Sequence, residues 1–536
     1  MKQPMPPFTR RDTLASFATL AALLATPAGL KAAEETGLRF GEARPFSFEG
    51  LIERARQMAA EDYVPPPRPV PEITEQIDYD AHGKLRYKPE HALWAHGEGV
   101  YPVTFVHLGR YFQKSVRMSA VGSDGQAREI LYDTAYFTMP EDHVAHQIPT
   151  DASAFAGFWV RESNRAGDWS AREPWATFVG ASYFRTVGEL GQVGMSARGI
   201  ALNTGGDGPE EFPDFTEFYL EPTRSEGEPF VFSALLDGPS ITGAYRFRMH
   251  RGVGVIVEVE KHLFLRADVE RLGIAPLTSM YWYGEYPSTH SHDWRPEVHD
   301  SDGLALWNGA GERLWRPAIN PPRIVISSFA DENPRGFGLS QRDRNYDHYL
   351  DGVSYDRRPT CWIEPIGTWG KGAVQLVEIP TDDEIYDNLV AFWLAEQPAK
   401  AGDALTYRYR MHWLKDEPFF PVANLARAFA TRIGRGGEPG KERPADVVKM
   451  VVEWDGEILK SIPWGVRPTV EASASRGELS LQRAEPIWYT DRWRSEFDLK
   501  FDGEDPVELR CFMSLEGQPI TETWLFQLHP QVLAHR

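Results

Sequence analysis

The fold class is decided by the run Tyr-Arg-Phe-Arg-Met-His-Arg-Gly-Val-Gly-Val-Ile-Val-Glu-Val, residues 245–259. Apolar side chains at Tyr245, Phe247 and Met249 alternate with basic ones, and a glycine-containing turn leads into a second strand-like segment. Because side chains of a strand point alternately to opposite faces, this period of two predicts half-buried antiparallel strands. The same alternation returns at residues 405–413, without a regular strand–helix alternation. The sequence therefore predicts a mainly β protein and disfavours a doubly wound parallel sheet.

The segments around this β region suggest where domains begin and end. Apolar residues at helical spacing predict an amphipathic helix over residues 47–62, which a proline-rich stretch ends. A short helical pattern covers residues 418–433, and glycines and a proline at 434–440 interrupt it, which is typical of a linker. Strand-like segments then resume, with Asp455-Gly456 as a hairpin-turn signal. About a hundred residues of short strands are typical of a small immunoglobulin-type β-sandwich.

The first residues have the pattern of an export signal. Arg10 and Arg11 precede an apolar stretch at 20–25, and small residues follow near 28–33. This order predicts a secretory signal and not a transmembrane helix, and the paired arginines favour the twin-arginine route to the periplasm. No later segment is apolar enough to span a bilayer. The predicted organisation is a signal peptide at 1–33, a large β-domain at 34–418, a linker with a short helix at 419–444 and a small β-sandwich at 445–536.

Composition narrows the class of partner. The 536 residues carry a formal charge of −20, which argues against nucleic acid because phosphate binding needs clustered lysine and arginine. An apolar fraction of 42% allows large buried cores, so disorder is not expected outside the ends and linkers. Cys361 and Cys511 lie far apart in the sequence, and we expect both to be free and buried.

Aromatic and carboxylate residues gather in two parts of the β region. Flat rings that cover sugar C–H faces, flanked by groups that hold hydroxyls, are what a sugar-binding cleft requires. A core role remains the alternative for any single ring. The candidate substrate-binding residues are Trp282, Tyr283, Tyr286, Trp294, Arg295, Asp302, Arg344, Arg358, Trp362 and Trp369. Glycoside hydrolysis usually needs two carboxyl groups in different environments, and the segments 297–302 and 381–388 supply the densest candidates.

The histidines near the first carboxylate segment allow a second interpretation. His290, His292, His299 and Asp300 could ligate a metal ion. Histidines in a sugar cleft more often hydrogen-bond hydroxyl groups, so we expect no metal and no cofactor.

Several stretches resemble the OpgG/OpgD (MdoG/MdoD) family, and they spread over most of the chain. They are Phe105–Phe112, Gly180–Arg185, Ser196–Gly199, Glu211–Pro222, Arg295–Gly303, Gly336–Arg344 and Val377–Trp393. The twin-arginine signal favours the OpgD branch. The resemblance implies a galactose-mutarotase-like β-sandwich followed by the immunoglobulin-like one. It also implies action on osmoregulated periplasmic glucan, whose backbone is β-1,2-linked glucose.

Members of this family are similar to anomer-inverting endo-β-1,2-glucanases, which implies roles for matching residues. Asp387 is the general acid by this resemblance, Asp300 the general base, and Tyr355 a candidate for relaying a proton toward the base. Asp302 is the main rival to Asp300. The same carboxylates would serve transfer to a sugar hydroxyl, so hydrolase and transglycosylase stay open. A non-catalytic protein that binds nascent glucan and presents it to other enzymes is the alternative function. The oligomeric state is open, a dimer included.

Overall fold

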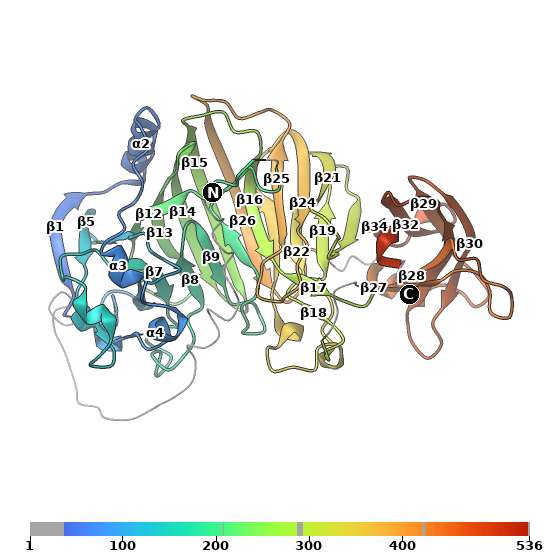
Figure 1. Ribbon diagram of the computed structural model, residues 1–536, viewed down its shortest axis with the longest axis horizontal. Helices are drawn as coiled ribbons and strands as arrows, with labels where there is room; N and C mark the ends of the chain where they lie inside the picture. The colour runs from blue at the N-terminus through green and yellow to red at the C-terminus, as the bar shows by residue number, and fades with distance from the viewer. Residues whose placement is uncertain (1–36, 207, 287–292, 421–423, 534–536) are drawn as a thin grey trace. The chain divides into compact units, whose positions relative to one another are not determined.

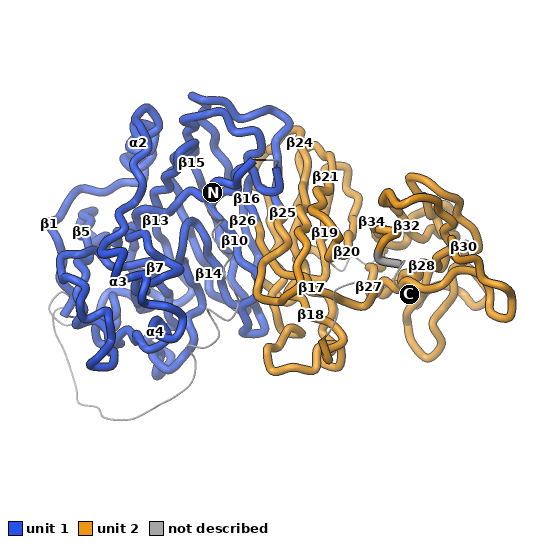
Figure 2. Tube along the Cα trace, viewed as in Figure 1, with its two compact units in different colours: residues 1–276, 392–413 blue, residues 277–391, 414–536 orange. Residues whose placement is uncertain are grey.

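The computed structural model describes residues 37–206, 208–286, 293–420 and 424–533, and strands dominate it (Figure 1). The mainly β prediction is confirmed. The predicted signal peptide lies outside the described residues. The chain divides into two compact units, unit 1 with Met1–Pro276 and Phe392–Trp413, and unit 2 with Leu277–Ala391 and Leu414–Arg536 (Figure 2).

Unit 1 is built from two sheets. The first has the order β1 (Arg39–Pro45), β5 (Gln126–Leu131), β4 (Arg117–Val121), β12 (Asp214–Leu220), β13 (Phe230–Asp237), β14 (Ile241–Arg251), β15 (Val255–Leu265) and β26 (Ala404–Leu414). The second contains β25 (Leu389–Ala395), β16 (Leu272–Ser279), β10 (Ser196–Arg198), β9 (Tyr183–Thr186), β8 (Ala176–Val179), β7 (Phe155–Val160) and β3 (Val103–His107). The predicted β14–β15 pair is confirmed, with Phe247 opposite Val259.

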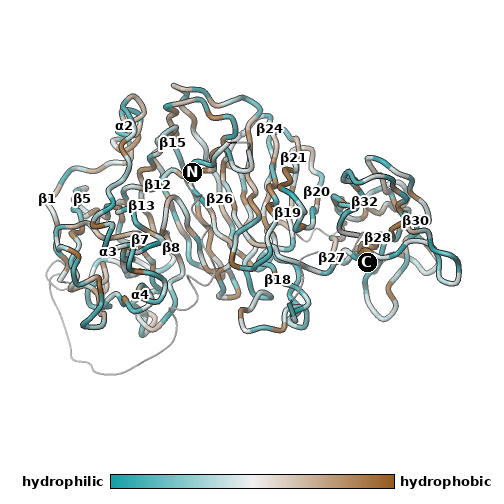
Figure 3. The backbone as a smooth tube through the Cα atoms, viewed as in Figure 1, coloured by the Kyte–Doolittle hydropathy of each residue, from teal (hydrophilic) through white to brown (hydrophobic). Residues whose placement is uncertain are grey.

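Aromatic rings fill the space between these sheets. Phe178 of β8 meets Phe232 of β13 edge-on at 4.8 Å between ring centroids, and Phe232 stacks on Phe247 at 4.7 Å. One face of the first sheet also carries α2 (Phe48–Ala59), whose Phe48 and Leu51 are buried. The helix predicted over 47–62 is therefore confirmed. Apolar and polar residues alternate along the strands, as the tube in Figure 3 shows.

Unit 2 contains one sheet in the order β23 (Thr360–Pro365), β22 (Gly336–Ser340), β19 (Gly303–Trp307), β20 (Arg313–Pro317), β34 (Thr523–Leu528), β32 (Val507–Leu515) and β29 (Thr469–Ala474). Another sheet has the order β27 (Arg427–Arg435), β28 (Val447–Asp455), β31 (Trp493–Lys500) and β30 (Glu478–Pro486). Strand β21 (Val325–Glu332) pairs with β24 (Lys371–Glu378) over its whole length, and a separate short pair joins β17 (Tyr281–Tyr283) to β18 (Val298–His299). The remaining α-helices and β-strands of unit 1 are α3 (Pro71–Thr74), α4 (Tyr79–Gly83), β2 (Arg86–Tyr87), β6 (Phe137–Thr138) and β11 (Ala201–Leu202). Those of unit 2 are α5 (Glu457–Lys460) and β33 (Gln518–Pro519).

Two local predictions are wrong. The segment expected to hold a short helix before residue 434 contains strand β27 instead, which pairs with β28 and buries Ala428 and Ala430. Pairing with a strand later in the chain overrides the local helical spacing. Asp455-Gly456 is not a hairpin turn, because β28 pairs with β27 and β31 and Gly456 precedes helix α5. Cys361 and Cys511 are free and buried, as predicted. In the described part of the chain no helix has the length and apolar character of a membrane span.

The large core of unit 2 joins residues from both sides of the predicted boundary at 444/445. Trp315 and Trp362 share it with Trp454, Phe497 and Trp524. The β20–β34 pair connects the same two parts of the sequence. The boundary itself stays a prediction.

Candidate functional site

The two segments with the predicted catalytic carboxylates are attached to the same short stretch of unit 2, around strand β17. The backbone N–H of Asp300 donates to the carbonyl of Met280 at 2.9 Å. The side chain of Asn388, the neighbour of Asp387, accepts from the N–H of Tyr281 at 2.8 Å and donates to its carbonyl at 2.9 Å. A buried asparagine with this many partners fixes backbone position. Asp300 and Asp387 therefore both lie next to residues 280–281.

Asp300 is buried, with 1% of its surface exposed. Its Oδ1 lies 3.1 Å from Nε of Arg358, whose side chain is 3% exposed. Burial lowers the pKa of Arg358, and a neighbouring guanidinium favours the ionised form of a carboxylate. The guanidinium of Arg358 also lies over the ring of Tyr355 at 5.3 Å. An ionised carboxylate is what a general base needs, and its burial means that a proton must reach it through other groups.

Tyr355 connects this ion pair to another carboxylate. Its hydroxyl donates to Oε2 of Glu384 at 2.6 Å. The same oxygen accepts from Nη1 of Arg295 at 2.8 Å. Glu384 lies three residues before Asp387 in the sequence. The carboxylate run at 381–388 signalled a functional segment, but only packing identifies Glu384 as the partner of Tyr355.

Arg295 is held by three carboxylates. Its guanidinium contacts Asp293 at 2.8 Å, Asp351 at 2.9 Å and Glu384 at 2.8 Å. Burial would lower the pKa of Arg295, but the hydrogen bonds to these carboxylates outweigh burial and raise it. The residue was predicted to bind substrate. Its observed contacts give it a structural role in joining the segments around 293, 351 and 384.

Asp302, the rival base, has a different environment. Its Oδ2 accepts from the backbone N–H groups of Arg342 and, at 2.6 Å, of Asp343. Its Oδ1 lies 3.5 Å from Nδ1 of His299, and its side chain is 17% exposed. Burial raises the pKa of Asp302, and the charge of His299 opposes that effect. Asp302 is thus the more accessible of the two carboxylates, and two backbone N–H groups hold it in place.

The acidic groups near His299 lie at ion-pair distance from histidine side chains. Burial would lower the pKa of His299, but the Asp302 carboxylate and the hydrogen bond to Glu297 outweigh it and raise the pKa to about 9. His299 Nε2 lies 2.9 Å from Glu297 Oε2, and its Nδ1 lies 3.0 Å from Gln341 Oε1. Glu297, His299 and Asp302 have ligand-type atoms within 4.8 Å of one another, and a metal ion there would have to displace the proton from His299. A second group with ligand-type atoms within 4.8 Å of one another, Glu297, Asp343 and His348, contains the His348–Asp343 contact. His290 and His292 lie outside the described residues.

Some of the predicted aromatic side chains are exposed and others are buried. Trp294 is 69% exposed and Trp282 is partly exposed, so both offer a ring surface. Tyr283 is buried beside Trp282, with 5.0 Å between ring centroids, and its hydroxyl donates to the carbonyl of Arg295 at 3.2 Å. Burial raises the pKa of the Tyr283 hydroxyl. Tyr286 packs edge-on against Phe526 at 5.3 Å.

The position of Trp362 differs from the one that the sequence led us to expect. It was expected to contact sugar, but its side chain is fully buried in the core of unit 2. A Cβ at Gly336 would lie 2.4 Å from this ring, so the glycine makes room for it. Trp369 is also largely buried, at 7% exposure. Aromatic residues near polar ones in sequence are a weak indicator of exposure, because neighbours in a strand face opposite sides.

Arg344 organises the backbone beside Arg358. Its guanidinium donates to the carbonyl of Asp356 at 2.9 Å and to that of Arg358 at 2.6 Å. Burial lowers the pKa of Arg344. These contacts fix the loop following Tyr355, and the substrate-binding role of Arg344 stays a prediction.

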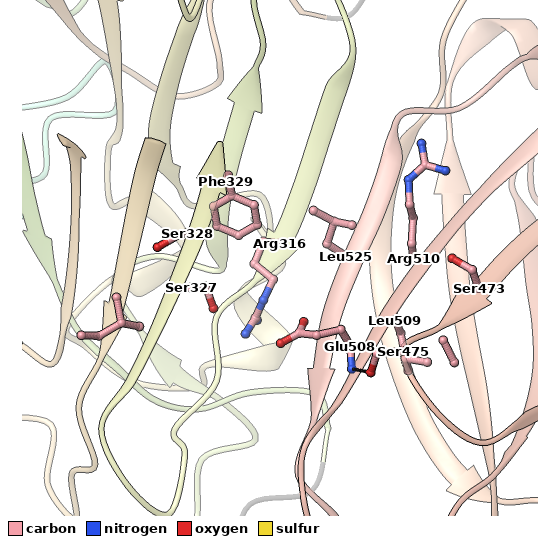
Figure 4. Close-up of a pocket in the computed structure, with 12 residues that line it drawn as sticks. Arg316, Ser327, Ser328, Phe329, Ser473, Ser475, Glu508, Leu509, Arg510 and Leu525 are labelled. Carbon is pink, nitrogen blue, oxygen red and sulfur yellow. Dashed lines mark hydrogen bonds between the residues drawn. The ribbon is translucent and has the colours of Figure 1, made fainter. Parts of the chain in front are cut away.

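A pocket of about 560 Å³ lies elsewhere in unit 2. Figure 4 shows Arg316, Ser327, Ser473 and Glu508 around it, with the N–H of Glu508 donating to Ser475 Oγ. Among the described residues, its lining includes none of the predicted site residues. Its volume falls within the roughly 300–1,000 Å³ of small-ligand sites.

The fold and the site together define a mainly β protein with a polar site rich in carboxylates, arginines and aromatic rings, a class suited to carbohydrate. The family model for "Periplasmic glucan biosynthesis protein, MdoG" matches residues 46–528. The chain belongs to this family.

Named relatives agree with this result. The chain is 52% identical to "Glucans biosynthesis protein D 2" of Ralstonia nicotianae, over 97% of this chain and 98% of that protein. It is 42% identical to "Glucans biosynthesis protein D" of Xanthomonas oryzae pv. oryzae, over 98% and 99%. It is 43% identical to the protein of that name from Stenotrophomonas maltophilia, over 98% and 97%. The resemblance stated from the motifs is confirmed.

Proposed function

We propose that this protein cuts or transfers the backbone of a β-1,2-linked glucan, as an anomer-inverting glycoside hydrolase or transglycosylase. The observation that carries the proposal is the attachment of the Asp300 and Asp387 segments to the same residues, Met280 and Tyr281. Inversion needs two carboxyl groups on either side of one sugar bond. The family name supports glucan as the class of substrate.

In the proposed mechanism, Asp387 donates a proton to the glycosidic oxygen while the bond from that oxygen to C1 breaks. The oxygen of water, or of a sugar hydroxyl in transfer, bonds to C1 from the opposite face. Its proton passes to Asp300, directly or through a hydroxyl relay that includes Tyr355. The burial of Asp300 favours a relay, because 1% exposure leaves little room for a water molecule in direct contact. In hydrolysis and in transfer, Asp387 gives one proton to the leaving oxygen and Asp300 takes one from water or from the sugar hydroxyl.

The alternative function is a non-catalytic glucan-binding protein. The ion pair between Asp300 and Arg358 supports this alternative. Buried ion pairs of this kind also occur in proteins where they have a purely structural role. Incubation of purified protein with linear β-1,2-glucan, followed by a reducing-sugar assay, tests the two. New reducing ends support hydrolysis, redistribution of chain length without new ends supports transfer, and an unchanged polymer supports the alternative.

The proposed location is the periplasm, after twin-arginine export. The support is the Arg10-Arg11 pair and the family's description as periplasmic. Replacement of both arginines by lysine should leave precursor in the cytoplasm, since the twin-arginine route reads this pair. Normal amounts of mature protein in the periplasm would contradict this route.

A further inference from the structure

Three large aromatic side chains are exposed on two neighbouring turns of unit 2. Trp464 is 83% exposed, Trp488 is 64% exposed and Tyr489 is completely exposed at 105%. The rings of Trp464 and Trp488 lie 5.9 Å apart between centroids, at 54° to each other. We call these three residues the aromatic platform. The turns that carry it follow α5 and connect β30 to β31; β30 is labelled in Figure 1.

The first turn is built to expose its tryptophan. The N–H of Val466 donates to the carbonyl of Pro463 at 3.1 Å, which closes a four-residue turn. Gly465 has φ of +84°, a conformation that favours glycine at the third position of such a turn. Trp464 therefore occupies the second position, where a side chain points outward from the turn.

The second turn holds its two aromatics with its own hydrogen bonds. The N–H of Ile487 donates to the carbonyl of Arg492 at 2.9 Å, and the hydroxyl of Thr490 donates to the carbonyl of Ile487 at 2.8 Å. Tyr489 has φ of +67°, in the left-handed region where a non-glycine residue is strained. Such backbone strain is often found at functional sites. The exposed Tyr489 side chain gains no packing energy that would offset this backbone strain. We therefore interpret the strained conformation as a sign of a binding role at the surface.

Charges of both signs surround the platform, and several of them form ion pairs, whereas Arg467 and Arg492 lie over the rings of Trp493 at 5.7 Å and Phe429 at 3.4 Å. Lys460 of α5 contacts Glu457 at 2.7 Å and Asp491 of the second turn at 3.5 Å. On the adjoining strands, Arg494 lies 3.4 Å from Glu485. Charges of mixed sign do not form the cluster of four or more basic residues that is typical of anionic lipid binding. A neutral ligand fits this surface better.

The size of the platform also limits the occupant. Three aromatic side chains contribute about 150–250 Å² each when covered. That total is smaller than the about 800 Å² per partner of a stable protein–protein interface. A few sugar rings, whose apolar C–H faces stack on aromatic rings, match this area and this chemistry.

We propose that the aromatic platform is a second, non-catalytic binding site for a neutral glucose polymer. This inference rests on the proposed function, because it takes the same class of ligand. The platform would retain a long chain while other parts of it reach the carboxylates near residues 280–281. Oligosaccharides too short to occupy both places at once would gain nothing from it.

The test uses the full mature chain and the double variant Trp464→Ala/Trp488→Ala. Retardation in gels containing linear β-1,2-glucan measures binding to the polymer, and turnover of short β-1,2-gluco-oligosaccharides measures the catalytic site. We expect the double variant to bind the polymer roughly tenfold more weakly. Its turnover of short oligosaccharides should stay unchanged. Trp464→Phe/Trp488→Phe should restore binding, since it keeps flat rings, and Tyr111→Ala, which removes an exposed ring from unit 1, should have no effect.

The outcomes separate this inference from the proposed function. Polymer binding that is unchanged in the double variant overturns the platform, even if the enzyme is active. A wild-type protein that neither binds nor changes the polymer overturns both. If the double variant binds the polymer normally but no longer binds neutral phosphatidylcholine vesicles, the platform is a membrane contact and the inference is overturned. If it binds the polymer normally but no longer self-associates in sedimentation, the platform contacts a second copy of the chain, which also overturns the inference.

Discussion

The hydroxyl of Tyr355 lies 2.6 Å from Oε2 of Glu384 and donates a hydrogen bond to it. The ring of the same tyrosine lies beneath the guanidinium that pairs with Asp300. Tyr355 therefore contacts the segment of the proposed acid directly and is linked to the proposed base through Arg358. A proton relay toward Asp300 would pass through groups of this kind.

Tyr355→Phe tests this relationship. The variant keeps the ring under Arg358 and removes only the hydroxyl, so the loss of stability should be about 1 kcal/mol. We expect kcat on β-1,2-glucan to fall by roughly 10²–10⁴-fold with little change in KM, because proton transfer contributes in the transition state. Equal kcat for variant and wild type would leave Tyr355 with a purely structural role. Thermal unfolding provides the control for folding.

Asp387→Asn should bind glucan and scarcely turn it over. The amide keeps the size of the side chain but cannot donate a carboxyl proton, so kcat should fall by orders of magnitude while binding survives. Chain-length analysis of the glucan and retardation in glucan gels measure the two properties separately. Near-normal turnover would move the acid to a neighbour, with Glu384 the first candidate because of its contact with Tyr355.

Asp300→Asn and Asp302→Asn distinguish the two candidate bases. We expect the first to abolish turnover and the second to be milder in activity. Asp302→Asn should instead lower stability, because Asp302 accepts from two backbone N–H groups and lies 3.5 Å from the charged His299. The pair of variants is compared by turnover and by thermal unfolding. The opposite ranking in turnover would make Asp302 the base.

Lys261 provides a pH test in unit 1 that is separate from the site. It is fully buried and donates to the carbonyl of Gly199 at 3.0 Å, and burial lowers its pKa to about 7. The unfolded chain has the ordinary pKa of about 10.4, so between these values it binds more protons than the folded protein. The burial of Lys261 therefore destabilises the fold most at pH 7 and below, and this cost disappears as pH rises toward 10.4.

Lys261→Met should accordingly stabilise the protein at pH 7 and have a smaller effect at pH 10. Each unit of pKa depression corresponds to about 1.4 kcal/mol. The carbonyl of Gly199 keeps a partner, because the hydroxyl of Tyr245 also donates to it at 3.0 Å. Denaturant unfolding of both proteins at the two pH values gives the difference. A stabilisation that does not depend on pH would show that Lys261 is not deprotonated in the folded state.

Limited proteolysis examines the predicted linker. The exposed residues 438–442 should be cut first. The two pieces should stay together in size-exclusion chromatography, because Arg342, before the cut, contacts Glu522, beyond it, at 2.5 Å in the core of unit 2. A buried pair that loses one partner costs about 3–5 kcal/mol. Separation of the pieces as folded fragments would instead support two independently stable domains at the predicted boundary.

The sequence alone determined the class of fold and the family. Alternation such as that from Tyr245 to Val259 is a local property, and the strands it predicts were found with the expected pairing. The helix at Phe48–Ala59 is local in the same sense. Motifs spread from residue 105 to residue 393 were sufficient to indicate the family.

Only the tertiary structure decided which polar and aromatic residues meet. The sequence could not show that Trp362 is in the core and Trp294 at the surface, because burial depends on strands distant in the chain. The strand at Arg427–Arg435 arose in the same way, from pairing with β28 against a local helical pattern. Tyr355 and Glu384 are 29 positions apart, and their contact exists because the folded chain brings two loops together. Periodicity reports which face a residue occupies, whereas long-range packing determines what that face touches.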